Sequence, residues 1–208
     1  MKKITLALGG GGTKGFAHIG VIRQLEKEGY EIAAVAGTSV GAIVGAMYCS
    51  GFNTIEMEGF SKKLDFSKLI NRSTSSSPSL VGIQGLFNLL REKIGDKKFE
   101  DLKIPFIATA VDINSGQEIL LDSGRLLPAM QASSAIPGLF PSVKFNQMDL
   151  VDGGVLDPVP VSAVTGAGLN ALLDAIDTRL GKADEILDLS IRGHEGALIA
   201  WLYENADV

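Results

Sequence analysis

One serine of the chain stands in a Gly-x-Ser-x-Gly pentapeptide, formed by Gly37, Ser39 and Gly41. This spacing is typical of a nucleophile elbow, where a strand turns sharply into a helix and the glycines remove side chains that would clash in the strained turn. An apolar run at 32–36 precedes the pentapeptide and a run of small residues follows it. The pattern predicts a nucleophilic Ser39 above a helix N-terminus, which favours developing negative charge. For the bare pentapeptide, a serine that only caps the helix is the alternative.

A second glycine-rich stretch, GGGGTKG at residues 9–15, follows a short apolar run near the N-terminus. Successive glycine amides can converge on the oxyanion that forms when a serine attacks an ester. Gly10, Gly11 and Gly12 are therefore candidate oxyanion-hole residues.

The same stretch also satisfies the dinucleotide-binding pattern G-x-G-x-x-G through Gly10, Gly12 and Gly15. Glu31 lies about as far downstream as the acidic residue that binds a ribose hydroxyl, so a dinucleotide-binding protein is the rival hypothesis. Lys14 is followed by glycine rather than serine or threonine, which excludes a Walker A phosphate loop.

A third turn, LVDGG at residues 150–154, places Asp152 after an apolar run and before Gly153 and Gly154. The two glycines allow other backbone to approach the carboxylate closely. Taken alone, the pattern is also typical of an aspartate that accepts amide hydrogen bonds in a turn.

The positions of the histidines bear on whether the three turns form a catalytic triad or a dyad. The chain contains two histidines, His18 and His194, and neither stands in a histidine-bearing catalytic motif. A Ser-His-Asp triad needs an imidazole within hydrogen-bond reach of the serine. The simpler hypothesis is a dyad in which Asp152 accepts the proton of Ser39 directly.

The elements that must position these turns follow from hydrophobic periodicity. Strand, helix, strand and helix alternate through the first 51 residues, which predicts parallel strands joined by right-handed crossovers. A polar, serine-rich surface loop that borders the site is expected at 71–82. Further helices are predicted over 85–95 and 126–136, strands over 104–113 and 116–122, and a hairpin or strand over 141–154.

Composition narrows the function classes. The chain has 208 residues, a formal charge of -5 and no cluster of aromatic and basic residues, so nucleic acid is not an expected partner. The lone Cys49 excludes an intrachain disulfide and is expected as a buried thiol. Since neither an export signal nor a membrane span is visible, a cytoplasmic protein is expected, with peripheral membrane contact through the apolar stretch 80–90 as a hypothesis.

Four blocks of the sequence, taken in order, resemble the bacterial patatin-like phospholipases: LALGGGGTKGFAHIGVI, AGTSVGAIVGAMY, QASSAIPGLFPSV and LVDGGVLDPVPV. The resemblance covers residues 4–161 and implies an α/β three-layer sandwich with a mostly parallel central sheet. It implies lipid acyl hydrolysis without a metal or cofactor, with Ser39 as nucleophile, Asp152 as general base and the Gly10–Gly12 loop as oxyanion hole. Lys14 stands where the family often has arginine, which keeps the charge but loses the guanidinium fork.

The C-terminal residues depart from that pattern. Residues 162–208 resemble the C-terminal end of HflX-type GTPases, but the chain has neither a Walker A loop nor an Asn-Lys-x-Asp motif, so GTP binding is not expected. We expect an acyl hydrolase domain at 1–161 and an atypical segment of helix, short strand and helix at 162–208. A catalytically silent scaffold is a further hypothesis, because the tail is foreign to the family.

Overall fold

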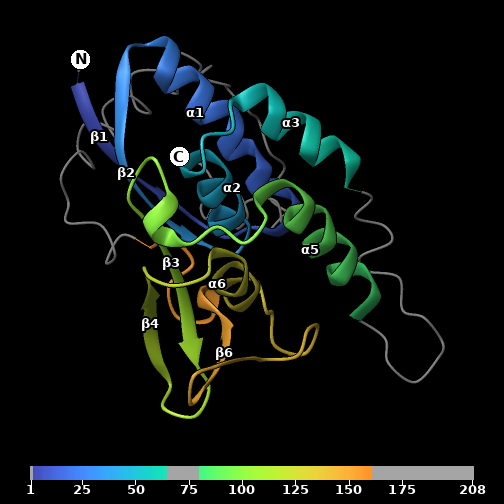
Figure 1. Ribbon diagram of the computed structural model, residues 1–208. Coiled ribbons are helices and arrows are strands. Elements are labelled where there is room, and N and C mark those ends of the chain that lie inside the picture. The colour runs from blue at the N-terminus through green and yellow to red at the C-terminus, as the bar shows by residue number, and fades with distance from the viewer. Residues whose placement is uncertain (1, 65–79, 161–208) are drawn as a thin grey trace, which may run out of the picture. The chain divides into compact units, whose positions relative to one another are not determined.

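The computed structural model describes residues 2–64 and 80–160. Within them, six strands form one sheet in the order β1-β2-β3-β6-β5, with β4 paired to β3 (Figure 1). The strands are β1 (Lys2–Leu8), β2 (Tyr30–Thr38), β3 (Phe106–Asp112), β4 (Gln117–Leu121), β5 (Val143–Phe145) and β6 (Met148–Asp152).

The first three strands are parallel neighbours, as the alternation of strands and helices predicted. The end of β2, from Val35 to Thr38, is buried at every position. Continuous burial of this kind is typical of a parallel strand that is covered on both faces.

The later strands are antiparallel, and β3 is the strand that joins the two parts of the sheet. Its first half pairs with β2, with Thr38 opposite Thr109, and its second half pairs with β6, with Asp152 opposite Ala110. Because β4 occupies the other edge of β3, β2 and β6 lie end to end along one edge. Their carboxyl ends therefore meet beside two consecutive residues of β3.

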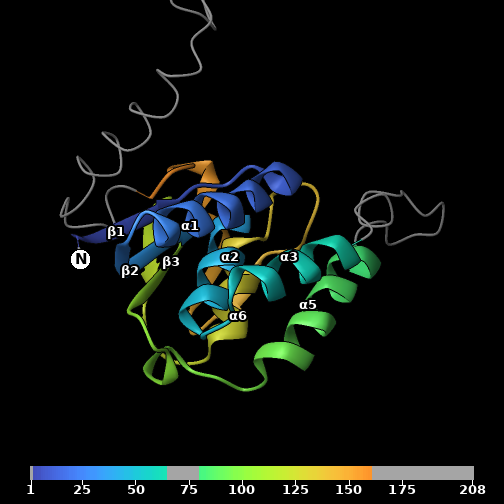
Figure 2. The same ribbon diagram turned by 90° about the horizontal axis from the view of Figure 1, so that it is seen from above.

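Five α-helices and three 3₁₀ turns accompany the sheet in the described residues. The helix α2 packs on β2, α1 and α3 pack on each other, and α5 packs on α6 (Figures 1 and 2). The helices are α1 (His18–Lys27), α2 (Val40–Cys49), α3 (Thr54–Lys63), α5 (Leu80–Ile94) and α6 (Leu126–Ser133), and the turns are η1 (Gly12–Ala17), η2 (Phe99–Asp101) and η3 (Gly153–Val155).

In α1 and α2, the pattern of apolar and small residues explains how much of each helix is buried. In α1, Ile19, Ile22 and Leu25 form a buried stripe at helical spacing, so one face of the helix packs inward. In α2, nine of ten residues are buried, and the small side chains allow the close packing that such a position requires.

Some boundaries differ from the predicted ones. The helix α5 starts at Leu80 rather than at residue 85, and α6 ends at Ser133, earlier than predicted. The first predicted helix is preceded by the 3₁₀ turn η1, and α1 itself begins at His18. The hairpin predicted over 141–154 is confirmed as β5 and β6.

Two of the predicted segments lie mostly or wholly outside the residues that the structure describes. Most of the predicted loop 71–82 and the whole segment 162–208 lie outside the described residues.

In the stretch 80–90, the hypothesised membrane contact, Leu86, Phe87 and Leu90 are buried and so pack inward. No helix of the described residues has both the length and the apolar character needed to cross a membrane.

Candidate active site

The predicted nucleophile lies at the junction of β2 and α2. Ser39 is the N-cap of α2 and has φ 56° and ψ −123°, a conformation that residues with a side chain rarely adopt. Such backbone strain costs about 1–3 kcal/mol and persists where the surroundings enforce it, which is typical of a functional residue.

The flanking glycines are required by close backbone approach. A Cβ on Gly37 would lie 2.6 Å from the carbonyl oxygen of Gly41. A Cβ on Gly41 would overlap the carbonyl oxygen of Leu8 and lie 2.6 Å from that of Gly9. The Gly-x-Ser-x-Gly pattern therefore has a steric reason here: backbone fills the space that side chains would need.

Buried hydrogen bonds hold the turn in place. The Ser39 amide donates to Oγ of Ser133 at 2.9 Å, and the Oγ1 atoms of Thr38 and Thr109 are 2.7 Å apart. The end of β2 is thus bonded sideways to β3, and the start of the elbow is bonded to the last residue of α6.

Asp152 lies at the end of β6 with only 5% of its surface exposed. Its Oδ1 accepts a hydrogen bond from the Gly154 amide at 2.8 Å. Burial raises the pKa of the carboxyl, while hydrogen bonds from the Ser39 side chain and the Gly154 amide lower it in part. A buried carboxylate with a raised pKa is a stronger base than an exposed one, and the Ser39 hydroxyl is its neighbour.

Gly153 and Gly154 have different surroundings. A Cβ on Gly153 would overlap Oγ1 of Thr109 and lie 2.8 Å from its carbonyl oxygen, so a side chain would push β3 away. A Cβ on Gly154 would lie 3.0 Å from Oδ1 of Asp152. Gly153 therefore lets the turn approach β3, and Gly154 leaves space for the carboxylate.

The glycine loop lies beside the nucleophile. A Cβ on Gly10 would lie 3.6 Å from Cβ of Ser39. Gly11 and Gly12 have φ 139° and 54°, values that favour glycine. A Cβ on Gly15 would overlap the Val40 side chain, so this glycine lets η1 approach α2.

One predicted oxyanion donor is already engaged. The Gly10 amide donates to the carbonyl oxygen of Pro158 at 2.8 Å, so it is not aimed at a substrate in this structure. The carbonyl oxygen of Gly9, in the same peptide unit, lies 3.0 Å from Nε2 of His18. His18 is thus hydrogen-bonded to the glycine loop. Gly12 begins η1, and first-turn amides lack acceptors within their own helix. Gly11 and Gly12 are the better donor candidates.

The strand register contradicts a ribose-binding role for Glu31. The glycine loop follows Leu8, which pairs with Gly37 at the carboxyl end of β2. Glu31 pairs with Lys3 near the opposite end of β2 and forms an exposed ion pair with it at 3.3 Å. A ribose ligand in a dinucleotide fold must lie at the same end as the loop. The glycine loop and Glu31 therefore lie at opposite ends of β2, and the structure does not bring them together.

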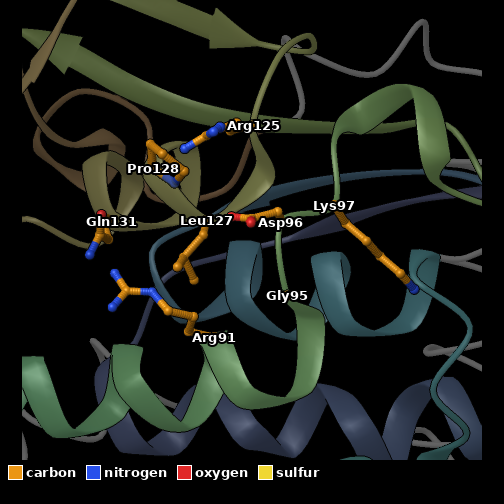
Figure 3. A pocket seen from close by; sticks show the side chains of 8 residues that line it. All are labelled: Arg91, Gly95, Asp96, Lys97, Arg125, Leu127, Pro128 and Gln131. Atoms are coloured by element: carbon orange, nitrogen blue, oxygen red, sulfur yellow. The ribbon is translucent and has the colours of Figure 1, made fainter.

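A separate polar hollow of about 260 Å³ lies between the end of α5 and the start of α6 (Figure 3). The predicted site residues do not line it. Lys97 donates to the carbonyl of Ser50 at 3.1 Å and extends away from the other lining side chains in Figure 3. The lining residues are Arg91, Gly95, Asp96, Lys97, Arg125, Leu127, Pro128 and Gln131. We assign no role to this hollow.

Three residues that form hydrogen bonds with the site were not predicted from the sequence: Ser133, Thr109 and Pro158. Each acts through one hydrogen bond to a residue far away in the chain. Ser133 lies in the block QASSAIPG, and the pattern does not show which of the two serines faces the elbow. Lys14, by contrast, is exposed in η1.

Comparison with known proteins places this site in a family context. The patatin-like phospholipase family profile matches residues 6–165, and the HflX C-terminal domain profile matches residues 154–208. An uncharacterized NTE family protein of Mycobacterium tuberculosis is 38% identical over 81% of this chain and 47% of its own length. The lysophospholipase NTE1 of Meyerozyma guilliermondii is 32% identical over 88% of this chain and 13% of its own length.

Among solved structures, VipD from Legionella pneumophila matches with a TM-score of 0.55 and 15% identity, over 75% of this chain and 46% of that one. At this identity the match supports the patatin-like α/β fold alone. The chain spans about half or less of the length of these relatives.

Proposed function

Because the chain belongs to the patatin-like phospholipase family, we propose that it is a serine acyl hydrolase that cleaves carboxylic esters of phospholipids or other lipids. One observation carries the proposal. The strained Ser39 and the buried Asp152 lie where the carboxyl ends of β2 and β6 meet, and the Ser39 hydroxyl is near enough to the carboxyl to lower its pKa in part.

The proposed reaction has two halves. In the first, Oγ of Ser39 forms a bond to the acyl carbon while Asp152 takes the hydroxyl proton. The carbonyl oxygen becomes an oxyanion, which the amides of Gly11 and Gly12 stabilise. Asp152 then gives the proton to the leaving alcohol as the ester bond breaks. In the second half a water molecule attacks the acyl carbon while Asp152 takes its proton. The bond between the acyl carbon and Oγ of Ser39 then breaks, Asp152 returns the proton to Oγ, and the fatty acid leaves.

The surface beside the dyad supports an apolar substrate. Val155, Leu156 and Val159 follow Asp152 closely in the chain and are 54%, 53% and 47% exposed. Val159 also adjoins the glycine loop, since a Cβ on Gly9 would lie 3.0 Å from its Cγ2. An acyl chain or the surface of a lipid aggregate would cover these side chains favourably. Peripheral contact with membranes belongs to this proposal.

A fluorophosphonate probe tests the assignment, because it forms a covalent adduct only with an activated serine. We expect one adduct per chain, located at residue 39 by peptide mapping, and no adduct on Ser39→Ala. Turnover of a carboxylic ester is expected to disappear in the same variant while its circular dichroism stays unchanged.

Two results would contradict the proposal in whole or in part. A folded wild-type protein that takes up no label and cleaves no ester would support the catalytically silent scaffold. A labelled serine other than Ser39 would reject the nucleophile but keep the hydrolase.

A further inference from the structure

We propose that Ser133, the last residue of α6, is a positioning residue that holds the nucleophile Ser39 in its reactive conformation. The proposal deepens the proposed function and rests on it for its kinetic part. Its central observation is the hydrogen bond from the Ser39 amide to Oγ of Ser133, at 2.9 Å between two buried residues. Ser133 has no exposed surface.

The end of α6 holds both members of the dyad. Ser133 accepts from the Ser39 amide, and the Ala135 carbonyl oxygen accepts from the Asp152 amide at 3.0 Å. Ser133 and Ala135 therefore fix the backbone of the nucleophile and of the base relative to each other. Of these two contacts, only the one from Ser133 uses a side chain, so only that contact can be removed by substitution.

The strain at Ser39 explains why such a contact matters. The residue has φ 56°, and a backbone in this region relaxes unless its surroundings hold it. The direction of the Cα–Cβ bond, and so the place of the hydroxyl, follows from that backbone conformation. Without an acceptor at Ser133 the buried Ser39 amide would lose its partner, which favours a turn of the peptide towards another acceptor.

The neighbouring serine supplies a matched control. Ser134 is also buried, and its hydroxyl has no hydrogen-bond partner in the part of the chain that the structure describes. Its backbone amide donates within the last turn of α6, to Met130 at 3.1 Å, and a side-chain change leaves this contact intact. Ser133→Ala and Ser134→Ala remove the same atom from adjacent buried positions, but only the first removes a contact to the dyad.

The experiment compares Ser133→Ala, Ser133→Thr and Ser134→Ala in the full chain. The readouts are kcat and KM on a soluble ester, the rate constant of fluorophosphonate labelling, and the thermal midpoint. For Ser133→Ala we expect kcat and the labelling rate to fall about tenfold, the size of one lost hydrogen bond, with KM nearly unchanged. Ser133→Thr keeps the acceptor and should restore most of both rates per folded molecule, and Ser134→Ala should match wild type.

Two outcomes would overturn the proposal. One is a Ser133→Ala variant with the wild-type kcat and labelling rate per folded molecule. The other is an equal loss in Ser133→Ala and Ser134→Ala, which would show a general effect of packing at the end of α6.

A spectroscopic arm separates this proposal from the proposed function. In ¹⁵N-labelled protein, the Ser39 amide resonance should move strongly and its hydrogen exchange should accelerate in Ser133→Ala, while Ser134→Ala leaves both unchanged. This readout needs no turnover. An inactive wild type with the expected amide changes would reject the hydrolase and keep the structural role of Ser133. An active wild type with an unmoved Ser39 amide would do the reverse.

Discussion

The backbone of Ser39 is the most strained point in the described site, and strain of this kind can be measured. Ser39→Gly and Ser39→Ala both remove the hydroxyl, but only glycine adopts φ 56° and ψ −123° without cost. Relief of strain outweighs the added chain entropy of glycine, so we expect Ser39→Gly to exceed Ser39→Ala in free energy of unfolding by about 1 kcal/mol. Urea denaturation measures this difference. A less stable Ser39→Gly would show that the turn is relaxed.

The buried carboxyl of Asp152 predicts a stability difference that depends on pH. Burial, the largest influence, raises its pKa in the folded protein, so the folded state holds the proton more tightly than the unfolded chain does. The native protein therefore loses stability as the pH rises through this raised pKa. Asp152→Asn has no charge to bury, and its amide oxygen can still accept from Gly154.

We therefore expect Asp152→Asn to be inactive yet more stable than wild type at neutral pH. The difference should shrink as the pH falls below the pKa of the carboxyl. Denaturation of both proteins at several pH values tests this, and subtraction cancels the other carboxylates. A constant difference across the series would show that the carboxyl is not penalised by burial.

At the residue level, the sequence motifs predict candidate catalytic residues, but they do not predict which distant residues form hydrogen bonds with them. The types and spacing at Ser39 and Asp152 predict a nucleophile and a base, because a nucleophile elbow needs its glycines, and these roles stay predictions. The partner of the Gly10 amide could not be predicted, since Pro158 reaches it only through the fold. The choice between Ser133 and Ser134 depends on how the last turn of α6 is rotated, which one serine pair does not encode.

Between elements, α2 approaches the ends of β1 and β2 closely. A side chain at Gly41 would meet the backbone of Leu8 and Gly9, which cannot move without parting β1 from α2. We expect Gly41→Ala to lower the free energy of unfolding by at least about 2 kcal/mol and to abolish labelling of Ser39.

Gly20 in α1 is the matched control, because a Cβ there meets nothing within 4 Å. Gly20→Ala should raise the free energy of unfolding by about 0.5–1 kcal/mol, the usual gain at an open helix position. Equal effects at the two glycines would contradict the steric argument.

The elements themselves were predictable to different degrees. Regular alternation of apolar runs predicted β1, α1, β2 and α2 and their parallel arrangement. The helix α3 was missed although its signal was present: Asn53 followed three residues later by Glu56 is a capping box, and the structure shows both of its hydrogen bonds. The direction of β6 relative to β3 was not predictable, because it depends on a pairing between distant segments. That direction is what brings Asp152 to Ser39.

For the molecule as a whole, the proposed function raises the question of how an acidic protein would bind a lipid substrate. The formal charge of -5 gives no general attraction to anionic membranes, so under the proposed function the apolar side chains beside the site would supply the contact. Val155 and Leu156 adjoin the dyad in the chain and are about half exposed, and Ile55 at the start of α3 is 76% exposed. These positions allow loss of apolar surface to be compared at two places.

We expect Val155→Ser combined with Leu156→Ser to weaken binding to phospholipid vesicles about tenfold, because two half-buried aliphatic side chains contribute roughly 1–2 kcal/mol on entering the interface. Turnover of vesicle substrate should fall in parallel, and turnover of a soluble short-chain ester should change much less. Ile55→Ser removes a more exposed side chain away from the dyad and should leave vesicle binding unchanged. Co-sedimentation with vesicles measures the first effect, and paired assays on the two substrates measure the second. An equal loss on both substrates would mean that these residues shape the site itself, and weaker binding from Ile55→Ser would place the lipid contact on α3 as well.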